Sequence, residues 1–160
     1  MIMLKKLNLF FCISSLVWIG CSGAPSMTMT EYRITIGTAT LDDFLVISNK
    51  ILNRQRIVID RTEDRGMSAV IECKYEYPEL SNEEALQDIK EIKYQLILEA
   101  RAKGGTGVRM YSVRGTVRSY GRFGGSEEWV DIPANENTKR RIKLLANELK
   151  TEFESKIRAF

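Results

Sequence analysis

One predicted strand of this chain carries a row of side chains that can bind anions. Residues 108–120 alternate between apolar and polar side chains, and this alternation continues to Arg122. The polar face therefore presents Arg114, Arg118, Tyr120 and Arg122. A guanidinium group is a planar fork that matches phosphate or carboxylate, and a neighbouring aromatic ring can stack on a sugar. We take these four residues as a candidate ligand-binding site; the competing interpretation is a solvated sheet face whose arginines keep the protein soluble.

The chain has few residues that could perform catalysis. It contains no histidine, which excludes Ser-His and Cys-His nucleophilic sites and histidine-ligated zinc. The glycine-rich segment 104–107 lacks the lysine and the helix of a phosphate-binding loop. Three pairs of adjacent carboxylates remain, namely Asp42/Asp43, Glu83/Glu84 and Glu127/Glu128. The first two pairs lie at predicted helix N-termini, where acidic side chains favour the helix dipole, so we expect no enzymatic activity, no cofactor and no metal.

The first 20 residues have the pattern of a secretion signal. Lys5 and Lys6 precede an apolar run over residues 7–19, which is shorter than the roughly 20 residues of a bilayer-spanning helix. The run ends in Trp18-Ile19-Gly20-Cys21, which resembles the lipobox of bacterial lipoproteins. Gly20 and Cys21 match the strictest positions of that motif, whereas Trp18 and Ile19 replace its usual leucine and small residue.

The resemblance implies a lipid anchor. In bacterial lipoproteins the cysteine is diacylated after cleavage and becomes the N-terminus, which implies residues 1–20 as signal peptide and Cys21 as the lipidation site. Two acyl chains anchor stably, whereas one binds only marginally. Ser22, unlike an aspartate at that position, does not signal retention in the inner membrane, so the implied location is the outer membrane, facing the periplasm. An ordinary cleaved signal or an uncleaved anchor is the alternative.

The rest of the chain is organised as a tether and one domain. Residues 21–30 have no apolar period and predict a flexible, lipid-anchored tether, and residues 31–160 have the length of a single domain. Net charge is −5 over residues 31–100 and +6 over residues 101–160, which predicts solvated faces of both signs. Cys73 falls on the apolar face of a predicted strand, where burial makes a thiol inert.

Hydrophobic periodicity predicts the elements of that domain. Strands are expected over residues 31–38, 56–60, 67–77, 108–120 and 127–132, and helices over residues 41–54 and from residue 138 to 157. The alternation in the third strand puts Met67, Tyr75 and Tyr77 on the same apolar face as Cys73. In the last helix we expect the stripe Ile142, Leu145, Leu149, Phe153 and Ile157 to be core, the alternative being an exposed docking face.

Residues 82–103 allow two interpretations. Ser81 and Glu84 form a capping box, and a helix could run from residue 82 through Lys103. Alternatively, the helix breaks near Ile92 and a strand over residues 93–103 forms a hairpin with the following strand through the glycine-rich turn 103–107. We favour the strand, because the long strand that follows needs a partner.

Together these patterns predict an α+β fold, in which an antiparallel sheet of five to six strands has two or three helices packed on one face. The segment 41–77 is similar in pattern to modules of outer-membrane assembly lipoproteins of the BamC type, a similarity that implies no residue roles. We expect a non-catalytic envelope lipoprotein that acts as a scaffold or accessory subunit, with the membrane and other envelope proteins as partners. The alternative is a module that binds an anionic envelope glycan, polymer or lipid headgroup through the arginine-rich face. Nucleic acid is not an expected partner in the periplasm.

Overall fold

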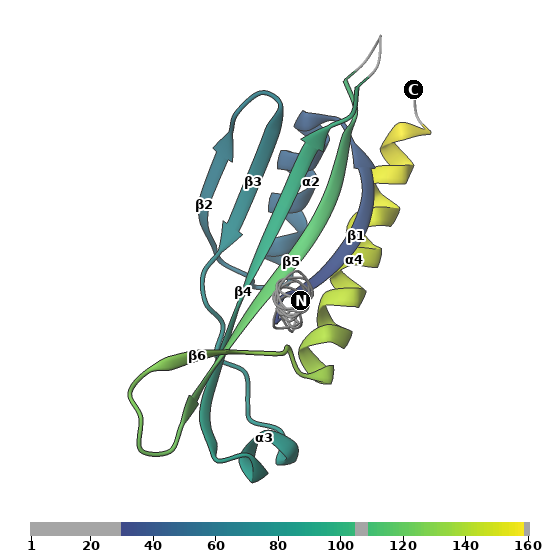
Figure 1. Cartoon of the computed structure of the whole chain (residues 1–160). Helices are drawn as coiled ribbons and strands as arrows, with labels where there is room; N and C mark the ends of the chain where they lie inside the picture. The colour runs from purple at the N-terminus through teal and green to yellow at the C-terminus, as the bar shows by residue number, and fades with distance from the viewer. Residues whose placement is uncertain (1–29, 105–108, 159–160) are drawn as a thin grey trace, which may run out of the picture.

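The structure is an α+β fold, as predicted. The computed structural model describes residues 30–104 and 109–158. Within them, six antiparallel strands form one sheet, and helices pack against one of its faces (Figure 1). The predicted signal peptide, the predicted lipidation site Cys21 and the tether up to residue 29 lie outside the described residues.

The elements follow one another as strand, helix, hairpin, short helix, three strands and long helix. Their bounds are β1 Tyr32–Ala39, α2 Leu41–Arg54, β2 Ile59–Asp64, β3 Ser68–Cys73, α3 Asn82–Leu86, β4 Ile89–Ala102, β5 Tyr111–Phe123, β6 Trp129–Ile132 and α4 Glu136–Ile157. The strand order across the sheet is β1-β5-β4-β3-β2. On the edge of β5 that faces away from β4, β1 and β6 pair one after the other. The hairpin of β4 and β5 therefore lies at the centre of the sheet, and the other strands are arranged around it.

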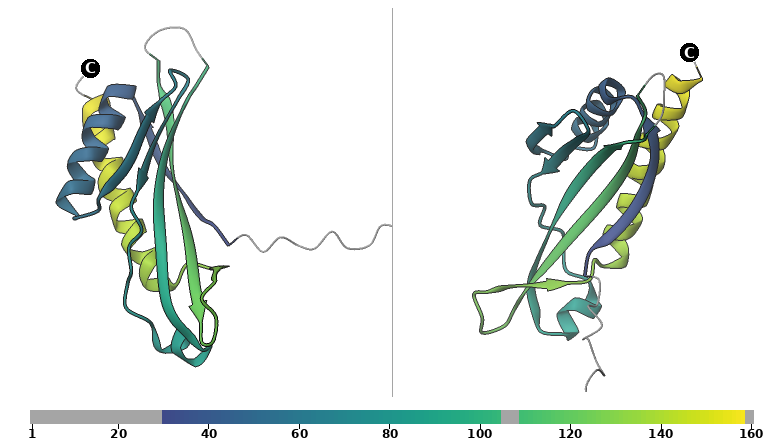
Figure 2. Two further views of the ribbon diagram at one scale, coloured as in Figure 1. Left: turned by 90° about the vertical axis from the view of Figure 1, so that its left-hand side faces the viewer. Right: turned by 45° about the horizontal axis from the view of Figure 1, so that its top comes forward.

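Two helices cover one face of this sheet, and α2 and α4 lie side by side there (Figure 2). Each begins at a side-chain cap: the Thr40 hydroxyl accepts a 3.2 Å hydrogen bond from the Asp43 N–H, and the Asn135 side chain accepts one of 2.7 Å from the Thr138 N–H. The apolar stripe of α4 faces the sheet and is buried at Ile142, Leu145, Leu149 and Phe153. The stripe is thus core, as predicted, except that Ile157 at its end is 37% exposed.

The strand predicted over residues 93–103 is present as β4, but it begins earlier than predicted and ends at Ala102. β4 starts at Ile89, and α3 is a single short helix that ends at Leu86, so the expected helix up to about Ile92 is wrong. The capping box of Ser81 and Glu84 is present. The helix ends there because Asp88 has a φ of 60°, a left-handed conformation that aspartate tolerates and a helix cannot include.

The β2–β3 hairpin has a tighter turn than the sequence predicted. β2 starts at Ile59 rather than residue 56 and takes in residues 61–64, which lay between the two predicted strands. The turn is closed around Gly66, whose φ of 71° suits glycine. β3 ends at Cys73, and the expectation that Met67, Tyr75 and Tyr77 share its buried face is wrong: they are 62%, 42% and 65% exposed. Beyond Cys73 the chain leaves the β3 register and pairs with β4 only through the Glu76–Tyr94 bridge, so Tyr75 and Tyr77 no longer follow the buried face of β3. Met67 lies in the turn before β3.

The end of β5 also differs from the prediction. The strand was expected to end at residue 120, but β5 continues to Phe123, and β6 begins at Trp129 rather than Glu127. Gly121 pairs with β4 on one side and β6 on the other, where a Cβ would lie 3.1 Å from the Ile132 side chain. Glycine here serves close packing within the sheet, not a loop. The predicted turn 103–107 lies partly outside the described residues.

Candidate functional site

The face of the sheet opposite α2 and α4 is not covered by either helix, and the predicted ligand-binding row lies on it. Alternation along β5 buries Tyr111, Val113, Gly115 and Val117 toward the helices. Arg114, Arg118, Tyr120 and Arg122 point to the other side, as predicted. We call this side the open face. The four predicted residues divide between two neighbouring parts of it.

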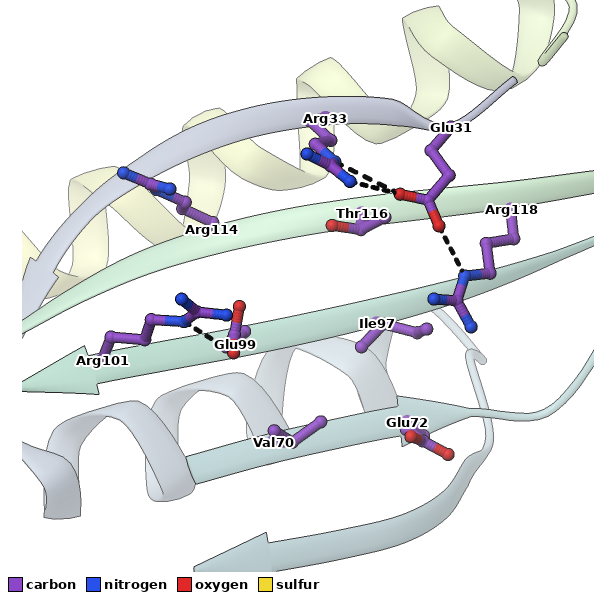
Figure 3. Close-up of a pocket in the computed structure, with 10 residues that line it drawn as sticks. All are labelled: Glu31, Arg33, Val70, Glu72, Ile97, Glu99, Arg101, Arg114, Thr116 and Arg118. Atoms are coloured by element: carbon purple, nitrogen blue, oxygen red, sulfur yellow. Dashed lines mark hydrogen bonds and ion pairs between the residues drawn. The ribbon is translucent and has the colours of Figure 1, made fainter. Parts of the chain in front are cut away.

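The first part is a shallow pocket of about 430 Å³ over β1, β5, β4 and β3 (Figure 3). Its charged lining consists of four arginines and three glutamates, namely Arg33, Arg101, Arg114, Arg118, Glu31, Glu72 and Glu99. Only two of these, Arg114 and Arg118, were singled out from the sequence. The others come from strands whose register with β5 is a tertiary property, since no local pattern reveals which residue pairs with which across a sheet.

Glu31 is held between two arginines of the pocket. It accepts hydrogen bonds of 2.7 Å from Arg33 and 2.8 Å from Arg118. The hydrogen bond from Arg33 and then that from Arg118 lower the pKa of Glu31 below its ordinary value. Arg118 is therefore engaged within the protein, and its guanidinium is not available in the way that the sequence suggested.

Arg114 is the exposed cation of this pocket without an acidic partner within the described part of the chain. In the β4–β5 register it lies opposite Glu99, but Glu99 instead accepts a 2.8 Å hydrogen bond from Arg101. Figure 3 shows the Arg114 side chain pointing away from the Glu99–Arg101 pair. Arg114 is thus the member of the predicted row that is best placed to contact an external anion.

The second part is an aromatic cluster that the sequence did not reveal. Lys93 of β4 lies among three rings, with its Nζ 4.1 Å from the centroid of Trp129, 4.7 Å from Tyr75 and 5.6 Å from Tyr120. Tyr77 packs edge-on against Trp129 at 6.3 Å. We call these five residues the Lys93 cluster.

The cluster is assembled by three strands and the segment after β3. Tyr120 lies opposite Lys93 across the β4–β5 pair, and Arg122 lies opposite Trp129 across the β5–β6 pair. Arg122 pairs with Glu91 at 2.5 Å and lies 5.6 Å from the Trp129 ring. Partial burial raises the pKa of Tyr120, so its hydroxyl stays neutral. Tyr120 is therefore a member of this cluster and Arg122 lies beside it, and neither residue lines the arginine pocket.

In two of the three carboxylate pairs considered for catalysis, one member has a structural role at a helix N-terminus. Asp43 and Glu84 lie in the first turns of α2 and α3, where each also accepts a hydrogen bond from the hydroxyl of its N-cap residue. Glu127 and Glu128 lie exposed before β6. Among residues 30–104 and 109–158, no three acidic or cysteine side chains come together as metal ligands.

A separate polar contact lies between the sheet and the start of α4. Arg141 donates hydrogen bonds of 2.6 Å to Glu76 and 2.5 Å to the hydroxyl of Tyr94. Tyr94 is buried, and burial raises the pKa of its hydroxyl. These residues lie on the helix side of the sheet and tie α4 to the segment after β3, so their position indicates a structural role.

The open face thus carries a pocket lined by four arginines and three glutamates, and beside it the aromatic Lys93 cluster. None of the helices in the described ranges combines the length and apolar content of a bilayer-crossing segment. No protein-family model matches this chain, and no curated protein matches it.

Proposed function

We propose that this protein is a non-catalytic envelope lipoprotein, anchored through acylated Cys21 at the periplasmic side of the outer membrane, which docks a partner subunit on its open face. The lipobox-like sequence supports the anchor. A sheet whose one face packs on helices and whose other face is left without a helix layer supports docking, because an uncovered face of this size is available to a partner.

One observation carries the docking proposal. Arg114 is exposed and lines the pocket, and no acidic side chain of the described residues pairs with it, although three glutamates line the same pocket. Each of two glutamates is already bound by a neighbouring arginine, namely Glu31 by Arg33 and Glu99 by Arg101. The partner subunit therefore presents a carboxylate to Arg114, and the ion pairs around it fix the geometry of the site.

Co-purification tests this function. Tagged full-length protein is extracted from membranes in mild detergent, and mass spectrometry reads its N-terminal acylation and any stoichiometric partner together. We expect a diacylated N-terminus and a bound envelope protein, with Arg114→Gln losing the partner. The matched control is Arg140→Gln, which neutralises an exposed arginine of α4 on the other side of the molecule.

Two results would overturn the proposal. One is a chain without acylation at Cys21. The other is a protein that purifies alone, or whose Arg114→Gln variant retains the partner as fully as Arg140→Gln does.

A second candidate function uses the same pocket for an anionic envelope polymer. The observation that favours it is the gathering of four arginine side chains around one open pocket. A pull-down on isolated cell wall or lipopolysaccharide distinguishes it, since a polymer held by exposed charges is released as salt is added. Retention that is insensitive to salt, or equal for wild type and Arg114→Gln, would exclude the polymer.

A further inference from the structure

The Lys93 cluster exposes aromatic side chains of the kind found at membrane surfaces. Tyr75 and Tyr77 are 42% and 65% exposed. Tryptophan and tyrosine favour the headgroup region of a bilayer, because one part of the ring system is apolar and the other bears a polar group. Lysine and arginine reach lipid phosphates from the same depth.

The cluster carries a cation that is not neutralised locally. Lys93 has no ion pair within the described part of the chain, whereas Arg122 is paired with Glu91. Asp131, the acidic residue of β6, lies opposite Tyr120 in the β5–β6 register. The ammonium of Lys93, held among three rings, is thus the group that can meet an anionic headgroup.

The cluster lies next to the point at which the chain enters the domain. Thr30, the first described residue, lines a hollow of about 230 Å³ together with Arg118, Tyr120 and Asp131. Tyr120 is itself a member of the cluster. Figure 2 shows β1 starting on the side of the sheet away from α2 and α4, which is the side of the open face.

The distance from the proposed anchor to this point is short. Thr30 follows Cys21 by nine residues. A flexible chain of that length spans roughly 17 Å on average, and fully extended it reaches about 30 Å. An acyl anchor at Cys21 therefore keeps the Thr30 end of the domain within about 30 Å of the bilayer, and the Lys93 cluster is at that end.

From this placement we propose that the Lys93 cluster contacts the lipid surface itself, with its aromatic side chains in the headgroup region of an anionic bilayer and Lys93 on a lipid phosphate. This inference rests on the proposed lipid anchor. It orients the domain, because the end of the open face at β6 then lies on the membrane and the arginine pocket stays accessible beside it. The anchor and the cluster act as two linked contacts, the second being strengthened by the local concentration that the tether provides.

The fluorescence of Trp129 can report on this contact. Its two tryptophans are Trp18 and Trp129, and Trp18 belongs to the predicted signal peptide, so Trp129 is the one tryptophan of the mature chain. The acylated protein is reconstituted into vesicles of phosphatidylethanolamine and phosphatidylglycerol that contain lipids spin-labelled near the headgroup. We expect Trp129 fluorescence to be quenched and shifted to shorter wavelength, and to be quenched much less in vesicles of phosphatidylcholine alone.

Matched variants separate the cluster from general charge effects. Lys93→Glu reverses the proposed phosphate contact, and Tyr77→Ser removes an exposed ring without changing charge. Both are expected to reduce the quenching to the phosphatidylcholine level. Lys50→Glu makes the same charge change at an exposed position of α2, on the helix side of the sheet, and is expected to leave quenching unchanged.

The outcomes separate this inference from the proposed function. Absence of quenching in protein whose acylation mass spectrometry has verified would overturn the lipid contact and leave the anchor in place. Quenching in wild type that persists in Lys93→Glu and Tyr77→Ser would also overturn it. If Trp129 instead becomes shielded only when a partner protein is bound, the cluster is a protein-docking surface and the lipid contact is wrong. A chain without acylation would overturn the proposed function itself.

Discussion

Arg141 of α4 donates a 2.6 Å hydrogen bond to Glu76, which lies in the segment after β3, 65 residues earlier in the chain. The same guanidinium nitrogen contacts the buried hydroxyl of Tyr94. The other carboxylate oxygen of Glu76, Oε1, is buried and has no hydrogen-bond partner among the described residues. Glu76 thus depends on a single arginine, and that arginine fixes the first turns of α4 against the sheet.

We therefore expect Arg141→Met to destabilise the protein. The substitution keeps much of the apolar stem but leaves Glu76 and Tyr94 without their shared donor, a loss of about 1–3 kcal/mol in the free energy of unfolding. Urea denaturation measures it. Arg140→Met is the control, because the Arg140 side chain forms no ion pair or side-chain hydrogen bond within the described residues, and the free energy of unfolding of this variant is expected to change by less than about 0.5 kcal/mol. Equal effects of the two substitutions would show that the Glu76 contact contributes nothing.

Glu31 predicts a dependence of stability on pH. Its arginine partners lower its pKa in the folded state below the ordinary value of 4.5. Between the pKa of Glu31 in the folded state and that in the unfolded state, the folded protein therefore binds fewer protons. The stabilisation by the Glu31 ion pairs is complete above pH 4.5 and is lost as the pH falls through the folded-state pKa. Because the pair is near the surface, its size is a few tenths to about 1 kcal/mol.

Comparing wild type with Glu31→Gln across pH isolates the stabilisation that the Glu31 ion pairs provide. The difference in the free energy of unfolding is expected to be constant near neutrality and to shrink below pH 4.5. Glu127→Gln serves as the reference, since Glu127 is exposed and forms no ion pair within the described ranges. A difference that stays constant down to pH 2 would contradict the assignment.

The faces of the strands could be predicted from the sequence because their period is local. Alternation in β5 correctly placed Arg114 and Tyr120 on the same open face, and the stripe in α4 correctly predicted its buried side. The alternation of side chains does not show where the pairing of a strand with its neighbour ends. Tyr75 and Tyr77 continue the pattern of β3, yet they are exposed, because the β3–β4 register ends at Glu72 and the chain pairs with β4 again only at the Glu76–Tyr94 bridge, shifted by one residue.

The candidate site was predicted in part for a related reason. Arg118 was identified by type and spacing, but its acidic partner Glu31 comes from the segment before β1, more than 80 residues away. Lys93 and Trp129 meet only because β4, β5 and β6 pair in one particular register. Such partners are set by the three-dimensional register, which a single sequence does not specify.

Cys73 is predicted to be unreactive in the folded protein. It is fully buried, and desolvation, with a smaller contribution from Glu76, raises the pKa of its thiol to about 12. Since the thiolate is the reactive form, at pH 8 the folded protein holds about a thousandfold less of it than a thiol of pKa 9 would. Labelling with iodoacetamide, read by peptide mass mapping, is expected to reach Cys73 in urea but not under native conditions. Rapid native labelling would show that this part of the core opens readily.

Neutralising two of the four pocket arginines, one at a time, is expected to separate binding from stability. Arg118→Gln deprives Glu31 of one of its two donors, so it costs up to about 1 kcal/mol of unfolding free energy. Arg114→Gln removes no ion pair of the described residues, so stability is expected to change by less than about 0.5 kcal/mol while partner capture is lost. Glutamine is preferred to glutamate at position 114, because a carboxylate there would face Glu99 across the β4–β5 pair and add a repulsion of its own. Chemical denaturation and co-purification of the same two variants measure both effects. If Arg118→Gln alone loses the partner and Arg114→Gln binds it as wild type does, the partner contacts Arg118 and not Arg114.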